Sequence, residues 1–322
     1  MSDKPAVVTL TPSPAIDRTY VLDSLTPGEV HRAHDVHSEL AGKGVNVTRN
    51  LRTAGVASIA VLPMLNEESV AFGDDQIRLY PVASRIRINI TVLDRAGQTT
   101  KINEAANPLA AHEWSGLCDV ALNLAEESST PWLLLAGTIP NDPSGGPLAL
   151  RALFEQARER EILVALDTSG SALLELARAG LPDLIKPNAP ELAECVGRSL
   201  RSLGDVVSAA REVHEWGVAH VLVSLGPDGM VGVSSSGVVH ASTAPVTVRN
   251  TIGAGDASVA GFFSHFVSHP DEFATSVGTA VAWGALKVQE VSSQLHSLEG
   301  LPEVSITTSP NLYQDLQEPG LI

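Results

Sequence analysis

Residues 250–257, near the C-terminal end of the sequence, read Asn-Thr-Ile-Gly-Ala-Gly-Asp-Ala and lead into an apolar helical pattern. Gly253 and Gly255 let the backbone turn tightly and approach a ligand closely. The first amides of the following helix lack partners within it, and with the helix dipole they form an anion site. A carboxylate repels a bound phosphate, so a functional role is expected for Asp256. The obvious role is that of a general base for an attacking hydroxyl. The alternative is that Asp256 only caps the helix.

A second glycine-rich turn, Ala-Gly-Lys-Gly-Val-Asn-Val at residues 41–47, also opens a helical pattern. Lys43 and Asn46 stand on its first turn, where a cation and an amide can hold an anion or a polyol. The Walker sequence GxxxxGK[ST] is absent, so the turn is not a P-loop. The alternative is an ordinary junction between a loop and a helix.

Two further motifs follow the ends of predicted strands. In residues 186–191, Lys-Pro-Asn-Ala-Pro-Glu, Asn188 and Glu191 can both lie at a helix start and order water around a magnesium ion. A capping box explains the same pair. In residues 223–229, Val-Ser-Leu-Gly-Pro-Asp-Gly, the backbone can receive a nucleotide base or ribose, although a hairpin turn is the favoured interpretation.

The elements that must position these motifs alternate between short apolar runs and helical patterns. The apolar runs are residues 6–10, 58–62, 132–136, 162–167, 184–186, 220–225 and 230–234. The helical patterns are residues 44–54, 112–127, 145–160, 171–179, 188–196, 203–216 and 257–266. Helices that alternate with strands buried on both faces predict a βαβ architecture with a parallel sheet.

Strands of another kind occur in the first third of the chain. Residues 17–25, 30–39, 85–94 and 98–103 alternate polar and apolar side chains, which predicts one buried and one exposed face. Because they are interleaved with the parallel-sheet elements, we predict a small antiparallel sheet projecting from the main domain. From Val304 onward the sequence predicts a loose acidic tail.

The composition restricts the partners of the protein. The chain has 322 residues, 37 acidic and 21 basic side chains, and a formal net charge of −16. Such a chain is not expected to bind nucleic acid or an anionic membrane surface. With two cysteines, no signal-peptide pattern and no bilayer-spanning apolar stretch, we predict a reduced, cytoplasmic protein. Any anionic ligand must be held by a few local cations and amides.

Together and in this order, the motifs resemble those of the PfkB family of ribokinase-like carbohydrate kinases. The residues that carry the resemblance are 14–17, 41–47, 87–89, 137–140, 167, 186–188, 224–226 and 251–256. The resemblance implies one ribokinase-like domain over residues 1–322, built as a three-layer α/β/α sandwich with a mostly parallel central sheet. It also implies a small β-sheet lid, with strands from about residues 14–39 and 85–103.

The resemblance implies roles for particular residues. Asp256 resembles the base that deprotonates the sugar hydroxyl, beside an anion hole made by the amides of Gly253, Ala254 and Gly255. The implied sugar-binding residues are Asp17, Gly42, Lys43, Asn46, Arg87 and Asn103. The implied nucleotide-binding residues are Lys186, Asn188, Ser224, Gly226, Gly229 and Thr251. Asn188 and Glu191 match the family's magnesium-associated NxxE pattern, which implies Mg²⁺ bound with ATP through water.

The sugar is expected to carry a phosphate already, because Lys43 and Arg87 are cations at which a second phosphate could dock. The motifs resemble the branch of 1-phosphofructokinases and tagatose-6-phosphate kinases, and residues 28–32 favour fructose 1-phosphate, converted with ATP to fructose 1,6-bisphosphate. The alternatives are a kinase for tagatose 6-phosphate or fructose 6-phosphate, and a non-catalytic sugar-phosphate sensor.

Three further expectations accompany the resemblance. Residues 62–82 are shorter than the family's usual segment, which normally borders the substrate. An open apolar face on the lid predicts a homodimer formed through it. The motifs leave open whether a monovalent cation takes part.

Overall fold

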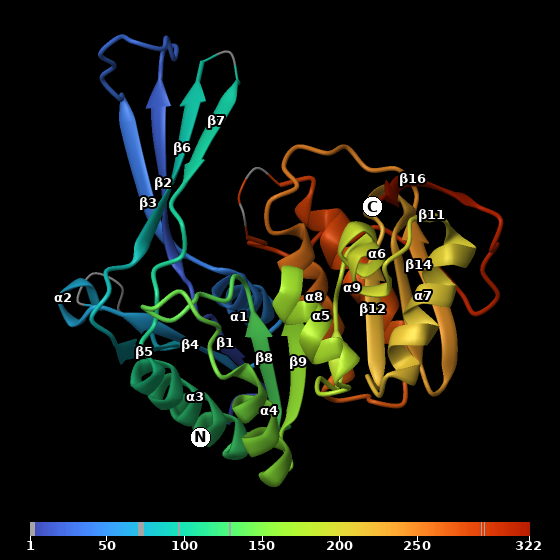
Figure 1. Cartoon of the computed structure of the whole chain (residues 1–322). Coiled ribbons are helices and arrows are strands. Elements are labelled where there is room, and N and C mark those ends of the chain that lie inside the picture. Colours follow the sequence, from blue (N-terminus) through green and yellow to red (C-terminus); the bar gives the residue numbers. More distant parts are fainter. Residues whose placement is uncertain (1–3, 70–73, 96, 129, 291, 293) are drawn as a thin grey trace.

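The computed structural model describes residues 4–69, 74–95, 97–128, 130–290, 292 and 294–322, and within them one ten-stranded sheet runs through the molecule (Figure 1). From one edge to the other its strands are β15 (Val304–Thr307), β14 (Gly237–Thr243), β13 (Met230–Ser234), β12 (His220–Ser224), β10 (Leu184–Ile185), β9 (Leu163–Asp167), β8 (Trp132–Ala136), β1 (Val7–Leu10), β4 (Ser58–Met64) and β5 (Ile77–Pro81). The strands from β12 to β5 are parallel to one another, and β13, β14 and β15 add an antiparallel edge. The mostly parallel sheet expected from the sequence is confirmed.

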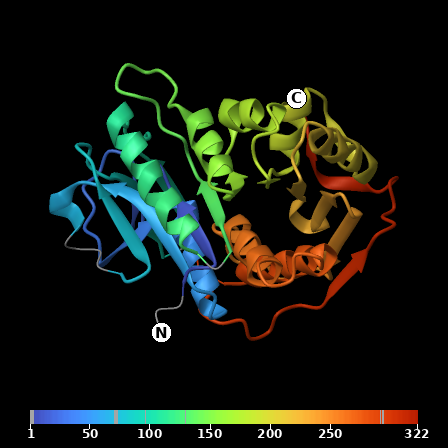
Figure 2. The ribbon, with the colours of Figure 1, turned by 90° about the horizontal axis from the view of Figure 1, so that it is seen from below.

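Helices cover both faces of this sheet (Figure 2). One face carries α3 (Ala111–Glu126), α4 (Leu150–Glu159), α5 (Gly170–Arg178), α6 (Ala189–Val196) and α7 (Leu203–Glu215), and the other carries α1 (Lys43–Thr53), α8 (Ala254–Phe266) and α9 (Phe273–Lys287). Along β8, Leu133 and Leu135 join the core beneath the first group, whereas Trp132 and Leu134 join the core beneath the second. Apolar side chains on both faces of one strand therefore produce the predicted three-layer sandwich.

A second, four-stranded sheet projects from this body (Figure 1). In order across the sheet, its strands are β3 (Asp35–Ala41), β2 (Ala15–Leu22), β6 (Arg87–Asp94) and β7 (Thr99–Asn103). The outer pairs are antiparallel, but the central pair of β2 and β6 is parallel. Along the chain, β2 follows β1 and β6 follows β5. Because β1 and β5 are parallel and end at the same edge of the large sheet, β2 and β6 leave that edge in the same direction. We refer to this four-stranded unit as the small sheet.

The C-terminal segment departs from the expected loose tail. Its first strand, β15, completes the large sheet, where a side chain on Gly278 would collide with Ile306. Its last strand, β16 (Asp315–Gly320), pairs with β11 (Leu200–Ser202). The prediction of marginal structure was therefore wrong, because small residues on α9 and a strand partner more than a hundred residues away hold the segment in place.

Other differences are local. The helix expected from residue 145 begins at Leu150, because the side chain of Asp142 accepts hydrogen bonds from the amides of Ser144 and Gly146 and holds a turn there. A short helix, α2 (Asn66–Ser69), lies in the shortened segment, of which residues 70–73 fall outside the described residues. Among the described residues we find no helix with both the length and the apolar character needed to cross a bilayer.

Candidate active site

The predicted site residues gather where the parallel strands of the large sheet end. Asp167 is the last residue of β9, Lys186 directly follows β10, and the first turns of α1 and α8 lie at the same edge. Ligands of open α/β sheets bind outside the carboxyl ends of the strands, so this is the edge at which a site is expected.

Asp256 lies on the first turn of α8 and faces α1. The turn begins at Gly253, whose φ of 80° is a left-handed conformation that suits glycine. Asp256 Oδ2 accepts a hydrogen bond of 2.8 Å from Asn46 Nδ2, across 210 residues of sequence. Among the described residues, no amide of α8 donates to the carboxylate of Asp256, so helix capping does not explain its position. The two glycine-rich turns meet through this contact.

The environment of Asp256 keeps its carboxylate unusually basic. Asp256 is only 7% exposed. This burial raises the pKa of its carboxyl group from 3.8 to about 6, and the negative charge of Asp167 adds to the effect. The hydrogen bond from Asn46 and the charges of Lys43 and Lys186 oppose the shift. A carboxylate with this pKa is ionised at neutral pH and can still accept a proton.

Two lysines converge on the buried carboxylate of Asp167. Lys43 Nζ lies 2.8 Å from Asp167 Oδ1, and Lys186 Nζ lies 3.7 Å from the same oxygen. Burial opposes the ionisation of Asp167, but Lys186 and Lys43 outweigh it and hold its pKa below the ordinary value. In the sequence, Asp167 contributes only to the family resemblance, and the structure shows that it anchors both lysines.

The glycines of both turns allow close approach. A Cβ on Gly42 would lie 2.8 Å from the Thr11 side chain, and one on Gly44 would also collide with Thr11. A Cβ on Gly255 would lie 3.5 Å from Lys186 Nζ, which places that ammonium against the start of α8. A larger residue at position 42 or 44 would therefore push α1 away from the end of β1.

The amides of the α8 turn differ in their availability. Ala254 N donates to the carbonyl of Thr251 at 3.2 Å, so it is already engaged in the turn. Within the part of the chain that the structure describes, the amides of Gly253 and Gly255 have no hydrogen-bond partner. Two free amides next to a lysine are the groups that an anion site requires.

The small sheet contributes a polar row close to its base. The register pairs Asp17 on β2 with Asn89 on β6, and Asn89 with Asn103 on β7, so the three side chains lie on one face. Asn89 Nδ2 donates to Asp17 Oδ1 at 2.9 Å. Asn89 was not among the predicted site residues, although it stands in the motif at residues 87–89 and shares a strand face with Arg87.

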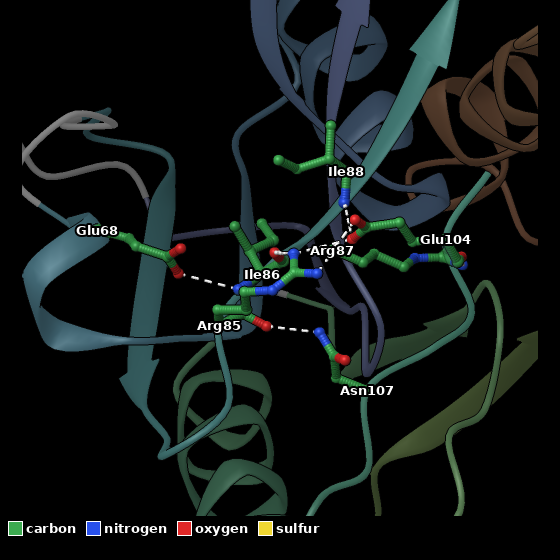
Figure 3. Close-up of polar contacts among 7 residues, drawn as sticks. All are labelled: Glu68, Arg85, Ile86, Arg87, Ile88, Glu104 and Asn107. Carbon is green, nitrogen blue, oxygen red and sulfur yellow. Dashed lines mark hydrogen bonds and ion pairs between the residues drawn. The ribbon is translucent and has the colours of Figure 1, made fainter. Parts of the chain in front are cut away.

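Arg87 begins β6 at the root of the small sheet. Figure 3 shows it beside Arg85 and Glu104, and its two terminal nitrogens donate to the carbonyls of Glu104 and Ser13, each at 3.3 Å. Burial lowers the pKa of Arg87, and only Asp17 opposes the shift. Arg85 instead makes two bonds to the Glu104 carboxylate, at 2.8 and 3.1 Å. Of these two arginines, Arg87 is the one that has no carboxylate in direct contact among the described residues.

Several buried polar atoms around this edge have no hydrogen-bond partner among the described residues. Buried polar atoms are normally bonded, so each such atom indicates a place for water or a ligand. The atoms are Thr11 Oγ1, Asn46 Oδ1, Arg87 Nε, Asn89 Oδ1 and Asp167 Oδ2. They come from the strand ends, the first turn of α1 and the small sheet, the elements that carry the residues expected to bind a sugar.

The predicted nucleotide residues lie farther along the same edge. Asn188 and Glu191 form a capping box at the start of α6, with bonds of 2.8 and 2.9 Å between the side chain of each and the amide of the other. The capping interpretation is therefore confirmed. The backbone of Asn188 also forms an isolated parallel β-bridge with Ser224 at the end of β12, which brings these two motifs together.

The loop after β12 is locked by the C-terminal segment. The loop is η1 (Gly226–Asp228), and the hairpin expected from the sequence is confirmed, since β12 and β13 are antiparallel. Asp228 is buried, and its carboxylate accepts hydrogen bonds from Gln317 N at 2.7 Å and from Gln317 Nε2 at 2.9 Å. A side chain on Gly226 would collide with Glu318, and one on Gly229 with the carbonyl of Ala241. No pattern in the sequence indicates this contact, because the residues involved are ordinary polar ones.

Comparison with known proteins agrees with this geometry. The model of the pfkB family of carbohydrate kinases matches residues 10–299. A 1-phosphofructokinase of Haloferax volcanii is 33% identical over 285 residues, which cover 85% of this chain and 89% of that protein. A 1-phosphofructokinase of Rhodobacter capsulatus is 32% identical over 317 residues, which cover 94% of this chain and 96% of that protein.

A solved structure is similar over almost the same extent. Phosphofructokinase-2 from Escherichia coli in complex with potassium has a TM-score of 0.82 and 27% identity, with 91% of this chain and 96% of that chain covered. The family match includes both glycine-rich turns and the aspartate that joins them, as well as the strands that place them. On these grounds the chain belongs to the pfkB family of carbohydrate kinases.

Proposed function

We propose that this kinase transfers the γ-phosphoryl group of ATP to fructose 1-phosphate and releases fructose 1,6-bisphosphate. The observation that carries the proposal is the contact between Asn46 and Asp256, at a turn with free amides and beside two lysines. The relatives named 1-phosphofructokinase support this sugar phosphate over tagatose 6-phosphate or fructose 6-phosphate.

In the proposed mechanism Asp256 is the general base. Asn46 holds Oδ2 of Asp256, which leaves Oδ1 to accept the proton of the attacking sugar hydroxyl. The hydroxyl oxygen forms a bond to the γ-phosphorus as the bond to the bridging oxygen of ATP breaks, and ADP leaves with that electron pair. The proton stays on Asp256 until the product departs.

The amides of the α8 turn and the two neighbouring lysines would stabilise the negative charge of the transferred group. The amides of Gly253 and Gly255 can donate to its oxygens, and Lys186 lies against this turn. Lys43 donates to Asp167 and is close enough to Asp256 for the two charges to interact. We therefore assign Lys43 to the transferred phosphoryl group, and not to the phosphate that the sugar already carries. Asp167 fixes the position of both lysines.

Arg87 is our candidate for binding the phosphate that the sugar already carries. Its guanidinium is half-buried, its Nε has no partner among the described residues, and its two other bonds are long. A phosphate can replace such weak carbonyl contacts with charge-assisted bonds. The polar row of Asp17, Asn89 and Asn103 and the unpartnered Oδ1 of Asn46 would then bind the sugar hydroxyls.

A magnesium ion would come with the nucleotide. Glu191 uses Oε2 in the capping box, and within the described chain its Oε1 has no partner, so it can hold a water of the ion. The described residues contain no group of three or more His, Cys, Asp or Glu suited to hold a metal, so the phosphates of ATP would supply most ligands. When bound, Mg²⁺ would neutralise the developing charge on the phosphates.

The small sheet offers a surface for a second copy of the chain. The face opposite the polar row carries Tyr20, Val36, Ile90, Val92 and Ile102, as the register requires. Val36 and Ile102 are exposed on it. We propose a homodimer through this face, and light scattering of an Ile102→Asp variant tests it, since a charge there should leave a folded monomer.

A coupled assay of ADP release tests the proposed function. The panel comprises fructose 1-phosphate, fructose 6-phosphate, tagatose 6-phosphate and unphosphorylated fructose, each with potassium or sodium salts. We expect the highest kcat/KM with fructose 1-phosphate, and a value no better than that of fructose would reject the substrate. Asp256→Asn should bind the sugar phosphate but lose turnover by orders of magnitude, whereas a non-catalytic sensor would release no ADP even with Asp256 in place.

A further inference from the structure

Lys287 is buried in the protein interior and has no part in the mechanism so far. It is the last residue of α9 and is 0% exposed. Lysine is almost never fully buried unless its charge is paired. Its Nζ donates to the carbonyl of Asn250 at 3.3 Å, which is the residue that leads into the α8 turn.

The end of α9 is tied to the approach of this turn by several bonds. The carbonyl of Val288 accepts from the amides of Arg249 and Asn250, at 2.7 and 3.1 Å. The side-chain oxygen of Asn250 in turn accepts from the amide of Ile252 at 3.0 Å. Lys287 therefore contacts the residue that shapes the turn, and does so with an amine that could carry a positive charge.

Close packing of α9 on α8 fixes this arrangement. A side chain on Gly284 would collide with Ser258, and its Cβ would lie 3.5 Å from the carbonyl of Ala254. Gly284 thus brings the C-terminal part of α9 against the first turn of α8, and Lys287 ends α9 three residues later. Burial lowers the pKa of Lys287, and the carboxylates of Glu290 and Asp256 oppose the shift, so Lys287 lies within the electrostatic range of the proposed base.

We propose that Lys287 is a positioning residue for phosphoryl transfer. Its ammonium holds the Asn250 carbonyl behind the α8 turn and so aims the free amides of Gly253 and Gly255. It also adds a fixed positive charge on the interior side of the turn, opposite the side that receives the γ-phosphoryl group. The proposal rests on the assignment of the α8 turn as the phosphoryl site.

Substitutions of Lys287 test this role against a structural one. Lys287→Met keeps the length of the side chain but removes the charge, and we expect kcat to fall about 10- to 100-fold, with the KM for the sugar phosphate changed less than about twofold. Ser276→Ala is the matched control, because Ser276 is a fully buried polar residue near the other end of α9. It should lower stability without changing kcat.

Rescue by a small cation gives a second readout. Lys287→Ala leaves a space beside the Asn250 carbonyl that an ammonium ion can fill, so ammonium chloride should restore kcat several-fold, whereas sodium chloride should not. The increase should exceed any response of the wild-type enzyme to the same two salts at equal ionic strength. If Lys287→Met and Ser276→Ala lose stability alike and both keep full kcat, Lys287 is only structural and the proposal is wrong.

Nucleotide binding separates a failure of this inference from a failure of the substrate assignment. Calorimetry with ADP and with a non-hydrolysable ATP analogue needs no sugar. Lys287→Met should weaken the analogue about tenfold more than it weakens ADP, because only the analogue places a γ-phosphate at the turn. Equal weakening of both nucleotides would overturn the role of Lys287, whatever sugar the enzyme uses.

Discussion

Replacing Asp256 by asparagine should inactivate the enzyme and stabilise its fold. The folded protein raises the pKa of Asp256 from 3.8 to about 6, mainly by burial. Between these two values the folded chain keeps a proton that the unfolded chain has lost, so the stability falls as the pH rises from about 4 to about 6. Above pH 6 the full cost of the ionised carboxylate is present.

The magnitude follows from the size of the shift. About two pKa units correspond to about 3 kcal/mol of unfolding free energy. Asparagine can still accept the hydrogen bond from Asn46 through its side-chain oxygen, but it carries no charge to bury. Asp256→Asn should therefore unfold with a free energy up to about 3 kcal/mol higher at pH 7.5, and nearly unchanged at pH 4.

Urea unfolding of both proteins at these two pH values measures the effect. Asp205→Asn is the control, because hydrogen bonds from the amides of Arg201 and Ser202 lower the pKa of Asp205, so the same substitution should destabilise the protein at pH 7.5. In wild-type kinetics, kcat/KM should fall tenfold per pH unit below about 6. A stability gain for Asp256→Asn that is equal at both pH values, or absent at pH 7.5, would refute the reasoning.

Three further substitutions have distinct expected results. Arg87→Ala should raise the KM for fructose 1-phosphate by about 10- to 100-fold, since charge-assisted bonds are lost, and leave that for unphosphorylated fructose unchanged in steady-state assays. Asp167→Asn leaves Lys43 and Lys186 without their shared partner, so denaturant unfolding should show a loss of about 3–5 kcal/mol. Gln317→Ala removes the hydrogen bond from Nε2 to Asp228 but keeps the one from the backbone amide, so it loosens the loop after β12; in steady-state assays it should raise the KM for ATP and leave that for the sugar phosphate unchanged.

Local chemistry in the sequence was sufficient to predict the elements that carry the site. Both glycine-rich turns combine small residues with a helical pattern, and each does begin a helix, at Lys43 and at Ala254. Apolar runs such as the one at Trp132–Ala136 are strands with the predicted bounds. These features depend on residues close together in the chain, where propensity and patterning act directly.

Features that depend on distant contacts were not predictable. The helix α9 is apolar around most of its surface, so its sequence has no polar face to mark a helix. Lys43 lies 124 residues from Asp167, and Gln317 lies 89 residues from Asp228, so no local pattern joins either pair. Lys287 could have been noticed only as a single charge in an apolar stretch.

The hydrogen bond between Asn46 and Asp256 also has a consequence for the synthesis of the protein. Its two residues are separated by 210 positions, and α1 is further held by Leu295, whose amide donates to Asn50 across 245 positions. A nascent chain can form local helices and early strand pairs as it leaves the ribosome, but these closures must await its last part. The base therefore comes into place only after residues 256 and 295 have left the ribosome, so chains that stop before them should not consume ATP.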